Sequence, residues 1–198
     1  ILFMNIALIF PGQGSQYIGM GQDFFESSDE TKLLFKNLDE IMGMKLSELI
    51  FKGSDEELSK TTNSQPAIMS VSIAILKEIN SRGLLNDKKI HSVAGHSLGE
   101  YSALVANNSL SFEDSVKLLI IRSEAMQRSM PLGTGGMVAV LGQSEEEILI
   151  IIEKLKLYGK LYIANDNADG QIVLSGEIRA IDHLCENAKT LGAKRAIK

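Results

Sequence analysis

Residues 93–103 read VAGHSLGEYSA and place Ser97 between two glycines, Gly95 and Gly99. An apolar run precedes the serine and a helix-forming run follows it, an arrangement typical of the sharp turn on which α/β enzymes hold a nucleophilic serine. A Cβ atom at either glycine would collide with the neighbouring strand or helix. The turn also aims a helix N-terminus at the hydroxyl, where amides and the helix dipole stabilise an oxyanion. The pattern predicts nucleophilic catalysis, and an incidental serine in a glycine-rich turn is the alternative.

A second glycine-rich stretch, FPGQGSQYIGMG at 10–21, follows the first predicted strand. In a parallel sheet this loop lies at the carboxyl ends of the strands, where the serine turn also emerges. A backbone amide of the loop is therefore a candidate second oxyanion donor. The loop lacks the G-x-x-x-x-G-K-[ST] pattern, which disfavours a nucleotide P-loop. A phosphate cradle or a mobile loop without function remains an alternative.

A serine hydroxyl is a poor nucleophile until a base accepts its proton, and the sequence has only three histidines. His96 adjoins Ser97, but the turn directs neighbouring side chains apart, so we interpret His96 as lining the cleft. His91 is expected at the far end of a strand, and His183 on a helix of the second domain. We expect none of the three to act as the general base.

Two arginines lie on the helix predicted at 111–130. Arg122 sits in the apolar run LLIIRSEAM, whereas Arg128 sits in a polar stretch. A substrate carboxylate in a partly dry cleft needs a charged, preferably bidentate, partner. Arg122 is therefore the candidate for that role, and a structural ion pair with a nearby carboxylate is the alternative.

The elements that must position these residues alternate along the first two thirds of the sequence. Strands are predicted at 5–10 and 90–95, and helices at 29–43, 64–83, 100–107 and 111–130. This alternation implies an α/β layer with a parallel sheet. The stretch PLGTGG at 131–136 then breaks the pattern. We place the domain boundary there, with a large domain at 1–131 and a small domain at 132–198.

The small domain has a different order of elements. Its predicted sequence is β-α-β-β-α-β, which is the split ferredoxin-like unit. Ser144 is expected to cap the first helix, and the DNADG stretch at 166–170 to form the turn between the middle strands. The strands are predicted at 137–142, 161–165, 171–176 and 193–198, and the helices at 144–157 and 178–192.

Composition narrows the function classes. The 198 residues carry a net charge of −5, so no basic face for nucleic acid is expected. A single cysteine, Cys185, excludes an intrachain disulfide, and we interpret it as a buried structural thiol. No clustered ligands have metal-site spacing, and no apolar run reaches the ~18 to 20 residues that cross a bilayer. A secretory signal is not expected, and the interpretation is a cytoplasmic protein without a membrane partner.

Five motifs, FPGQGSQ, TNSQPAI, AGHSLGEYSALV, R…MQ and VLSG, occur in a characteristic order and spacing. With them the chain resembles the malonyl-CoA:acyl carrier protein transacylases, the acyltransferase family of bacterial fatty acid synthesis, over essentially its whole length. GHSxGE combined with an upstream PGQGSQ is far more specific than either motif alone. The resemblance implies an α/β-hydrolase-like large domain, incomplete here, and a ferredoxin-like small domain.

The resemblance also implies a reaction. Ser97 would accept a malonyl group from coenzyme A as an ester and pass it to the phosphopantetheine thiol of acyl carrier protein. The backbone amides of Gln13 and Leu98 match the positions that form the oxyanion hole. The implied partners are malonyl-CoA and acyl carrier protein, with no metal and no cofactor beyond the thioester substrate.

The remaining implied site residues bind substrate. Arg122 matches the arginine that pairs with the free carboxylate of malonate, and His96 matches the residue before the nucleophile. Asn165 and Asn167 match positions of the small domain that line the cleft, although Asn-rich hairpin turns need no function.

In the family, the general base is a histidine shortly after the small domain, and this sequence stops at Lys198. We therefore expect the chain to correspond to the N-terminal two thirds of such an enzyme, to lack the catalytic histidine and to turn over poorly alone. An α/β-hydrolase-type esterase or thioesterase is an alternative, but it gives no reason for PGQGSQ or Arg122. A non-catalytic fragment that binds acyl carrier protein, or an acyltransferase for methylmalonyl units, is also an alternative.

Overall fold

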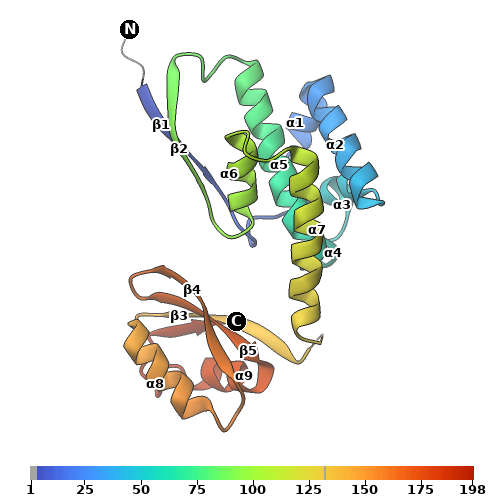
Figure 1. Ribbon diagram of the computed structural model, residues 1–198. Coiled ribbons are helices and arrows are strands. Elements are labelled where there is room, and N and C mark those ends of the chain that lie inside the picture. Colours follow the sequence, from blue (N-terminus) through green and yellow to red (C-terminus); the bar gives the residue numbers. More distant parts are fainter. Residues whose placement is uncertain (1–3, 132) are drawn as a thin grey trace. The chain divides into compact units, whose positions relative to one another are not determined.

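The structure is a computed structural model that describes residues 4–131 and 133–198 (Figure 1). The described chain divides into two compact units, one ending at Gln127 and the other beginning at Arg128. Each unit has its own hydrophobic core. Leu132, inside the boundary stretch predicted from the sequence, lies outside the described residues, as do residues 1–3.

Two parallel strands form the sheet of the first unit, β1 (Met4–Phe10) and β2 (Lys88–Gly95). The parallel pairing predicted from the alternation of strands and helices is thereby confirmed. The pairing shifts register between Ile6 and Ala7. The helices of this unit are α1 (Gln22–Ser27), α2 (Asp29–Met42), α3 (Leu46–Lys52), α4 (Asp55–Ser59), α5 (Thr61–Ser81), α6 (Gly99–Ala106) and α7 (Phe112–Ser129).

Helix α5 is the central helix of the first unit, and more than half of its residues are buried. It begins at Thr61 rather than at the predicted residue 64, so Pro66 lies inside the helix. Pro66 removes one backbone hydrogen bond, but the packing of the helix supplies most of its stability and outweighs that local cost. The early start matters for the site, because it places Thr61 and Gln65 four residues apart on one helix.

The second unit is an antiparallel sheet covered by two helices. Its strands have the order β4-β5-β3-β6, and α8 and α9 pack on the sheet through Ile148, Ile151 and Ile181. Ser144 caps α8 as predicted, by accepting a hydrogen bond from the amide of Glu147. The elements are β3 (Gly135–Leu141), α8 (Glu145–Leu155), β4 (Leu161–Ala168), β5 (Gln171–Glu177), α9 (Ile178–Asn187) and β6 (Arg195–Ile197).

The turn between β4 and β5 is shorter than the DNADG loop predicted from the sequence. Strand β4 runs on to Ala168, which leaves Asp169 and Gly170 as the turn. Gly170 has φ 71°, a left-handed conformation that an Asp-Gly hairpin turn requires. The Asn-rich stretch therefore belongs to a strand, where irregular pairing with β5 accommodates its polar residues.

Two negative findings apply to the described ranges 4–131 and 133–198. No helix there is both long and apolar enough to cross a membrane. No group of three or more His, Cys, Asp or Glu side chains there is arranged to hold a metal ion.

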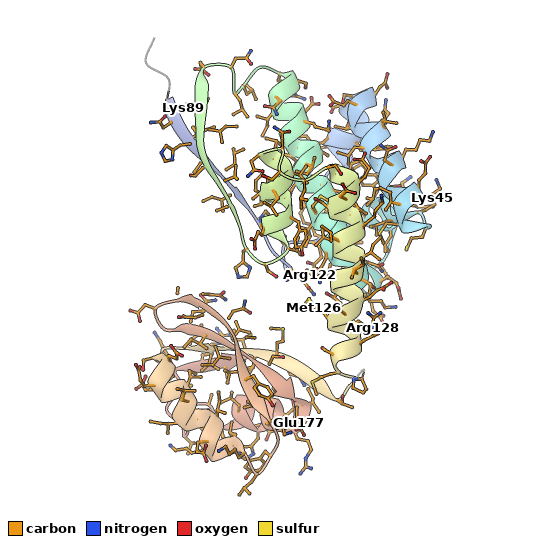
Figure 2. The ribbon with its side chains drawn as sticks, viewed as in Figure 1. Lys45, Lys89, Arg122, Met126, Arg128 and Glu177 are labelled. Atoms are coloured by element: carbon orange, nitrogen blue, oxygen red, sulfur yellow. The ribbon has the colours of Figure 1, made fainter. Side chains whose placement is uncertain are left out.

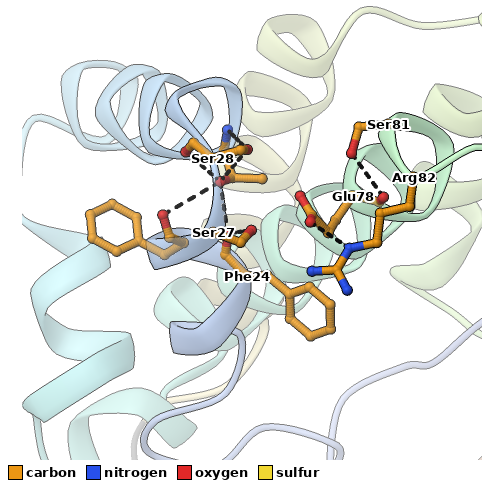
Figure 3. A network of polar contacts seen from close by, with 8 residues as sticks. Phe24, Ser27, Ser28, Glu78, Ser81 and Arg82 are labelled. Carbon is orange, nitrogen blue, oxygen red and sulfur yellow. Dashed lines mark hydrogen bonds and ion pairs between the residues drawn. The ribbon is translucent and has the colours of Figure 1, made fainter.

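A network of polar contacts lies at the start of α2 and the end of α5 (Figure 3). The hydroxyl of Ser28 caps α2 by accepting a hydrogen bond from the amide of Thr31. Near the end of α5, the buried carboxylate of Glu78 accepts a hydrogen bond of 2.7 Å from Nε of Arg82. The hydrogen bond from Arg82, with a smaller one from Ser27, holds the pKa of Glu78 below its ordinary value.

Replacement of Glu78 by Gln is expected to lower the free energy of unfolding at neutral pH. Because the pKa of Glu78 is lower in the folded protein than in the unfolded chain, its contribution is present above the ordinary carboxyl pKa. It is lost as the pH falls through the lowered value. Thermal denaturation of wild type and Glu78→Gln from neutral to acid pH measures this as a difference that shrinks with falling pH.

The matched control is Glu40→Gln, which removes the carboxylate of an exposed pair with Lys36 at the same helical spacing. Exposed pairs contribute little, so Glu40→Gln should leave the melting temperature nearly unchanged at every pH. A Glu78 effect that stays constant across the pH range would contradict the assignment.

Candidate active site

Ser97 lies on the turn between β2 and α6 and has φ 55°, a left-handed conformation that is strained for a residue with a side chain. A Cβ atom at Gly95 would lie 1.9 Å from the carbonyl carbon of Gly99, and one at Gly99 would lie 2.5 Å from the carbonyl oxygen of Phe10. The predicted need for glycine at both positions is confirmed. Ser97 is exposed at the point where the turn is sharpest.

The glycine-rich loop that follows β1 packs directly against the serine turn. The amide of His96 donates to the carbonyl of Phe10 at 3.1 Å. A Cβ atom at Gly12 would lie 2.6 Å from Nδ1 of His96, so only glycine allows the imidazole to approach this closely. The two glycine-rich motifs therefore meet at the same edge of the sheet, as expected for the carboxyl ends of parallel strands.

Two backbone amides near Ser97 are uncommitted. Leu98 is the N-cap of α6 and is buried, and Gln13 lies in the glycine-rich loop. Within the described ranges, neither amide donates to a protein acceptor. Amides at the start of a helix are positioned to bind an anion, because they have no partner within the helix.

Arg122 lies on α7 (Figure 2). Its Nη2 donates a hydrogen bond of 2.9 Å to Oγ of Ser97, and its Nη1 donates one of 2.6 Å to Oε1 of Gln65. Among the residues that the structure describes, no carboxylate lies within ion-pair distance of this half-buried guanidinium. The structural ion pair weighed as an alternative for Arg122 is therefore absent from this part of the chain.

Gln65 is a site residue that the sequence reasoning did not single out. Its side chain is fully buried on α5, and its Nε2 donates to Oγ1 of Thr61 at 2.8 Å. The hydroxyl of Thr61 in turn donates to Oε1 of Gln13 at 3.2 Å. A polar chain thus runs from the serine to the glycine-rich loop. The available signal was the place of Gln65 in the TNSQPAI motif, to which the sequence reasoning gave no role.

The other candidate residues are spread over both units. His96 is exposed beside the serine, and His91 is exposed on β2. His183 belongs to the second unit, where its ring stacks on Tyr158 at 3.7 Å. Asn165 is half-buried in β4 and pairs with β5. Asn167 also lies in β4. Roles for Asn165 and Asn167 in substrate binding stay predictions.

Cys185 lies on α9 and is partly buried against the core of the second unit. Burial raises the pKa of its thiol. A thiol is nucleophilic only as the thiolate, which this environment disfavours. Cys185 is therefore suited to packing rather than to catalysis, in agreement with the interpretation from the sequence.

Comparison with known proteins identifies one family. Residues 7–198 match the family described as acyl transferase domain. The chain is 47% identical over 194 residues to malonyl CoA-acyl carrier protein transacylase of Bacillus subtilis (strain 168), covering 98% of this chain and 60% of that protein. It is 40% identical over 192 residues to the protein of the same name from Staphylococcus aureus (strain MSSA476), covering 96% and 60%.

Solved structures agree with the sequence relatives. The malonyl CoA-acyl carrier protein transacylase of Clostridium perfringens matches with a TM-score of 0.84 at 43% identity, over 98% of this chain and 60% of that one. A malonyl-transacylase solved in complex with a type II polyketide synthase acyl-carrier protein matches with a TM-score of 0.86 at 35% identity, over 98% and 62%. The chain spans about 60% of the length of the curated relatives that it matches.

Ser97→Gly is expected to be more stable than Ser97→Ala by about 1 kcal/mol, because glycine adopts the left-handed conformation without strain. Both variants lose the hydrogen bond to Arg122, so their difference reports the backbone alone. Urea unfolding of the two variants measures it.

Ser123 supplies the control, since it is a buried serine inside α7. There the order should reverse, with glycine less stable than alanine by about 1 kcal/mol, because a helix interior disfavours glycine. Equal stabilities of the two Ser97 variants would mean that the turn carries no strain.

Proposed function

Because the chain belongs to the acyl transferase domain family, we propose that it transfers a malonyl group from malonyl-CoA to the phosphopantetheine thiol of acyl carrier protein through an ester on Ser97. The observation that carries this proposal is the 2.9 Å hydrogen bond between Arg122 and Ser97 Oγ. It joins a nucleophile to a guanidinium with no carboxylate partner among the described residues. A site of this kind suits an acyl group that brings its own carboxylate.

In the first half-reaction, Oγ of Ser97 attacks the thioester carbonyl carbon. The new C–O bond forms first, which puts the negative charge on the carbonyl oxygen, and a base accepts the serine proton. The C–S bond then breaks, and coenzyme A leaves as a thiolate that takes up that proton from the base. In the second half-reaction, the carrier protein thiol attacks the ester, and Ser97 recovers its proton. The reaction needs no redox partner, no metal and no cofactor beyond the thioester itself.

The proton acceptor must be a group other than Arg122, because a guanidinium has only donors. The hydrogen bond from Arg122 therefore positions Oγ of Ser97 without activating it. His91, His96 and His183 are not proposed as the base, since the first is on β2, the second directly adjoins the nucleophile and the third is stacked on Tyr158. A base outside these three completes the mechanism.

Charge develops on the carbonyl oxygen during both attacks. The uncommitted amides of Gln13 and Leu98 are the proposed donors to that oxyanion. One such donor is worth about 3 kcal/mol in the transition state. The close packing of the glycine-rich loop against the serine turn supports this pairing of donors, because it fixes the loop against the turn.

Arg122 is proposed to bind the malonyl carboxylate. When that carboxylate binds the guanidinium, the hydrogen bond from Nη2 to the neutral hydroxyl of Ser97 gives way to a stronger one between two ionised groups, and the hydroxyl is released for attack. An acyl group without a carboxylate offers no such exchange. The preference for malonyl over acetyl groups would then arise at the same contact that holds the nucleophile.

We also propose a fold type for each of the two domains. The order β4-β5-β3-β6 supports a ferredoxin-like small domain, and the serine turn between β2 and α6 supports an α/β-hydrolase-like large domain. We assign the large domain to 1–131 and the small domain to 132–198. His96 and Asn165 are the further proposed substrate-binding residues.

The test is transfer by the protein expressed from its complete gene. With malonyl-CoA and holo acyl carrier protein, we expect release of coenzyme A, malonyl-carrier protein as product, and a malonyl ester on Ser97 by mass spectrometry. Ser97→Ala should abolish the ester. Arg122→Ala should lower kcat/KM for malonyl-CoA by on the order of 100-fold and change that for acetyl-CoA far less.

Lys117→Ala is the matched control, since it removes an exposed cation from the same helix. It should leave both rates unchanged. Release of free malonate without the carrier-protein product would indicate a thioesterase. The absence of any acyl-Ser97 species would reject the proposal.

A further inference from the structure

The side-chain amide of Gln65 makes three contacts in the first unit, and all of its polar atoms are used. Oε1 accepts a 2.6 Å hydrogen bond from Nη1 of Arg122. Nε2 donates to Oγ1 of Thr61 at 2.8 Å and to Sδ of Met126 at 3.3 Å. Met126 lies one turn beyond Arg122 on α7 (Figure 2). Gln65 therefore joins α5 to α7 at the level of the guanidinium.

The chemistry of these partners fixes the orientation of the amide. A guanidinium can only donate, so the oxygen of Gln65 must face Arg122. The thioether of Met126 can only accept, so the nitrogen must face the opposite way. Rotating the amide by half a turn would place N–H groups against N–H groups. The side chain is fully buried, and water cannot relieve such a clash.

The partner of Arg122 is therefore a neutral acceptor where a carboxylate of the same shape would fit. A glutamate at 65 would neutralise the guanidinium in a poorly solvated place, where opposite charges interact strongly. An arginine already paired with a buried carboxylate has little affinity left for a second one. Because glutamine is neutral, it holds the guanidinium in place without neutralising its positive charge.

We propose that Gln65 is a positioning residue that aims Arg122 at Ser97 and keeps its charge available, so that the identity of residue 65 sets the preference for acyl groups that carry a carboxylate. This inference rests on the proposed function of the same site. Gln65 acts through Arg122 and is not itself assigned a contact with substrate.

Thr61 connects Gln65 to the glycine-rich loop. Its hydroxyl accepts from Gln65 and donates to Oε1 of Gln13, which gives it one defined orientation. Gln65 and Thr61 thus hold the guanidinium and the glycine-rich loop in one hydrogen-bonded chain. Replacing Gln65 should weaken the binding of the malonyl group, and replacing Thr61 should weaken it to a smaller extent.

The experiment compares kcat and KM for malonyl-CoA and acetyl-CoA in the protein expressed from its complete gene. Gln65→Glu should lower kcat/KM for malonyl-CoA by on the order of 10- to 100-fold, mainly through KM, and leave acetyl-CoA within a few-fold. The ratio of the two substrates is the readout, because a general loss of structure lowers both. Thr61→Val, at a less buried position, should raise KM for malonyl-CoA less strongly.

Asn63→Asp is the matched control. Asn63 is a buried amide on the same helix, but its Nδ2 donates to the carbonyl of Glu57, and no hydrogen bond among the described residues connects it to Arg122. This change should cost stability and leave the substrate ratio at the wild-type value. Circular dichroism spectra and melting temperatures of all variants show how much each substitution lowers stability, so that the substrate ratios can be compared between equally folded proteins.

The outcomes separate the two levels of inference. A wild-type protein that does not transfer malonyl groups overturns the proposed function, and with it this inference. A wild type that does transfer them, together with Gln65→Glu or Thr61→Val variants whose substrate ratio matches that of Asn63→Asp, overturns the role of Gln65 alone. A ratio shifted toward acetyl-CoA only in the Gln65 and Thr61 variants supports it.

Discussion

The close approach of strand β2 to helix α6 is the constraint on which the rest of the site depends. The backbone at Gly95 and Gly99 comes so near that no side chain fits at either residue, and the chain can turn there only with Ser97 in a left-handed conformation. That geometry exposes the hydroxyl and places the amide of Leu98 at the helix start. It also brings the loop after β1 against His96. The backbone therefore fixes the position of the Ser97 hydroxyl, and the side chain of Arg122 supplies the positive charge beside it.

The second organising feature is a half-buried cation held by neutral partners. Arg122 donates to an amide oxygen and to a hydroxyl, and both are weaker partners than a carboxylate. The protein therefore bears a desolvation cost that an ion pair would have offset. Such a cost is expected where the compensating charge arrives with a ligand. The hydrogen bonds from Arg122 to Gln65 and from Gln65 to Thr61 hold the cation in this position.

The spacing of neighbouring residues was enough to predict structural features that residues adjacent in sequence form among themselves. The serine turn and the Ser144 cap are each specified by a few adjacent residues, and the structure contains both. The parallel pairing of β1 with β2 was predicted from the alternation of strands and helices along the chain. The hydrogen bond from Arg122 to Gln65 joins residues far apart in sequence, so no spacing pattern could reveal it. Helices α1, α3 and α4 were missed because each is too short to show a helical period. The hairpin was misplaced because Asn and Asp, common in turns, here extend strand β4.

The strain at position 97 has a consequence for how gene copies of this fold should diverge. In a copy that no longer needs a nucleophile, the left-handed backbone at position 97 favours glycine over any other replacement of the serine. Gly95 and Gly99 are needed by any copy that folds at all, active or not. The flanking glycines are then a marker of shared ancestry, and the residue between them is a marker of retained chemistry.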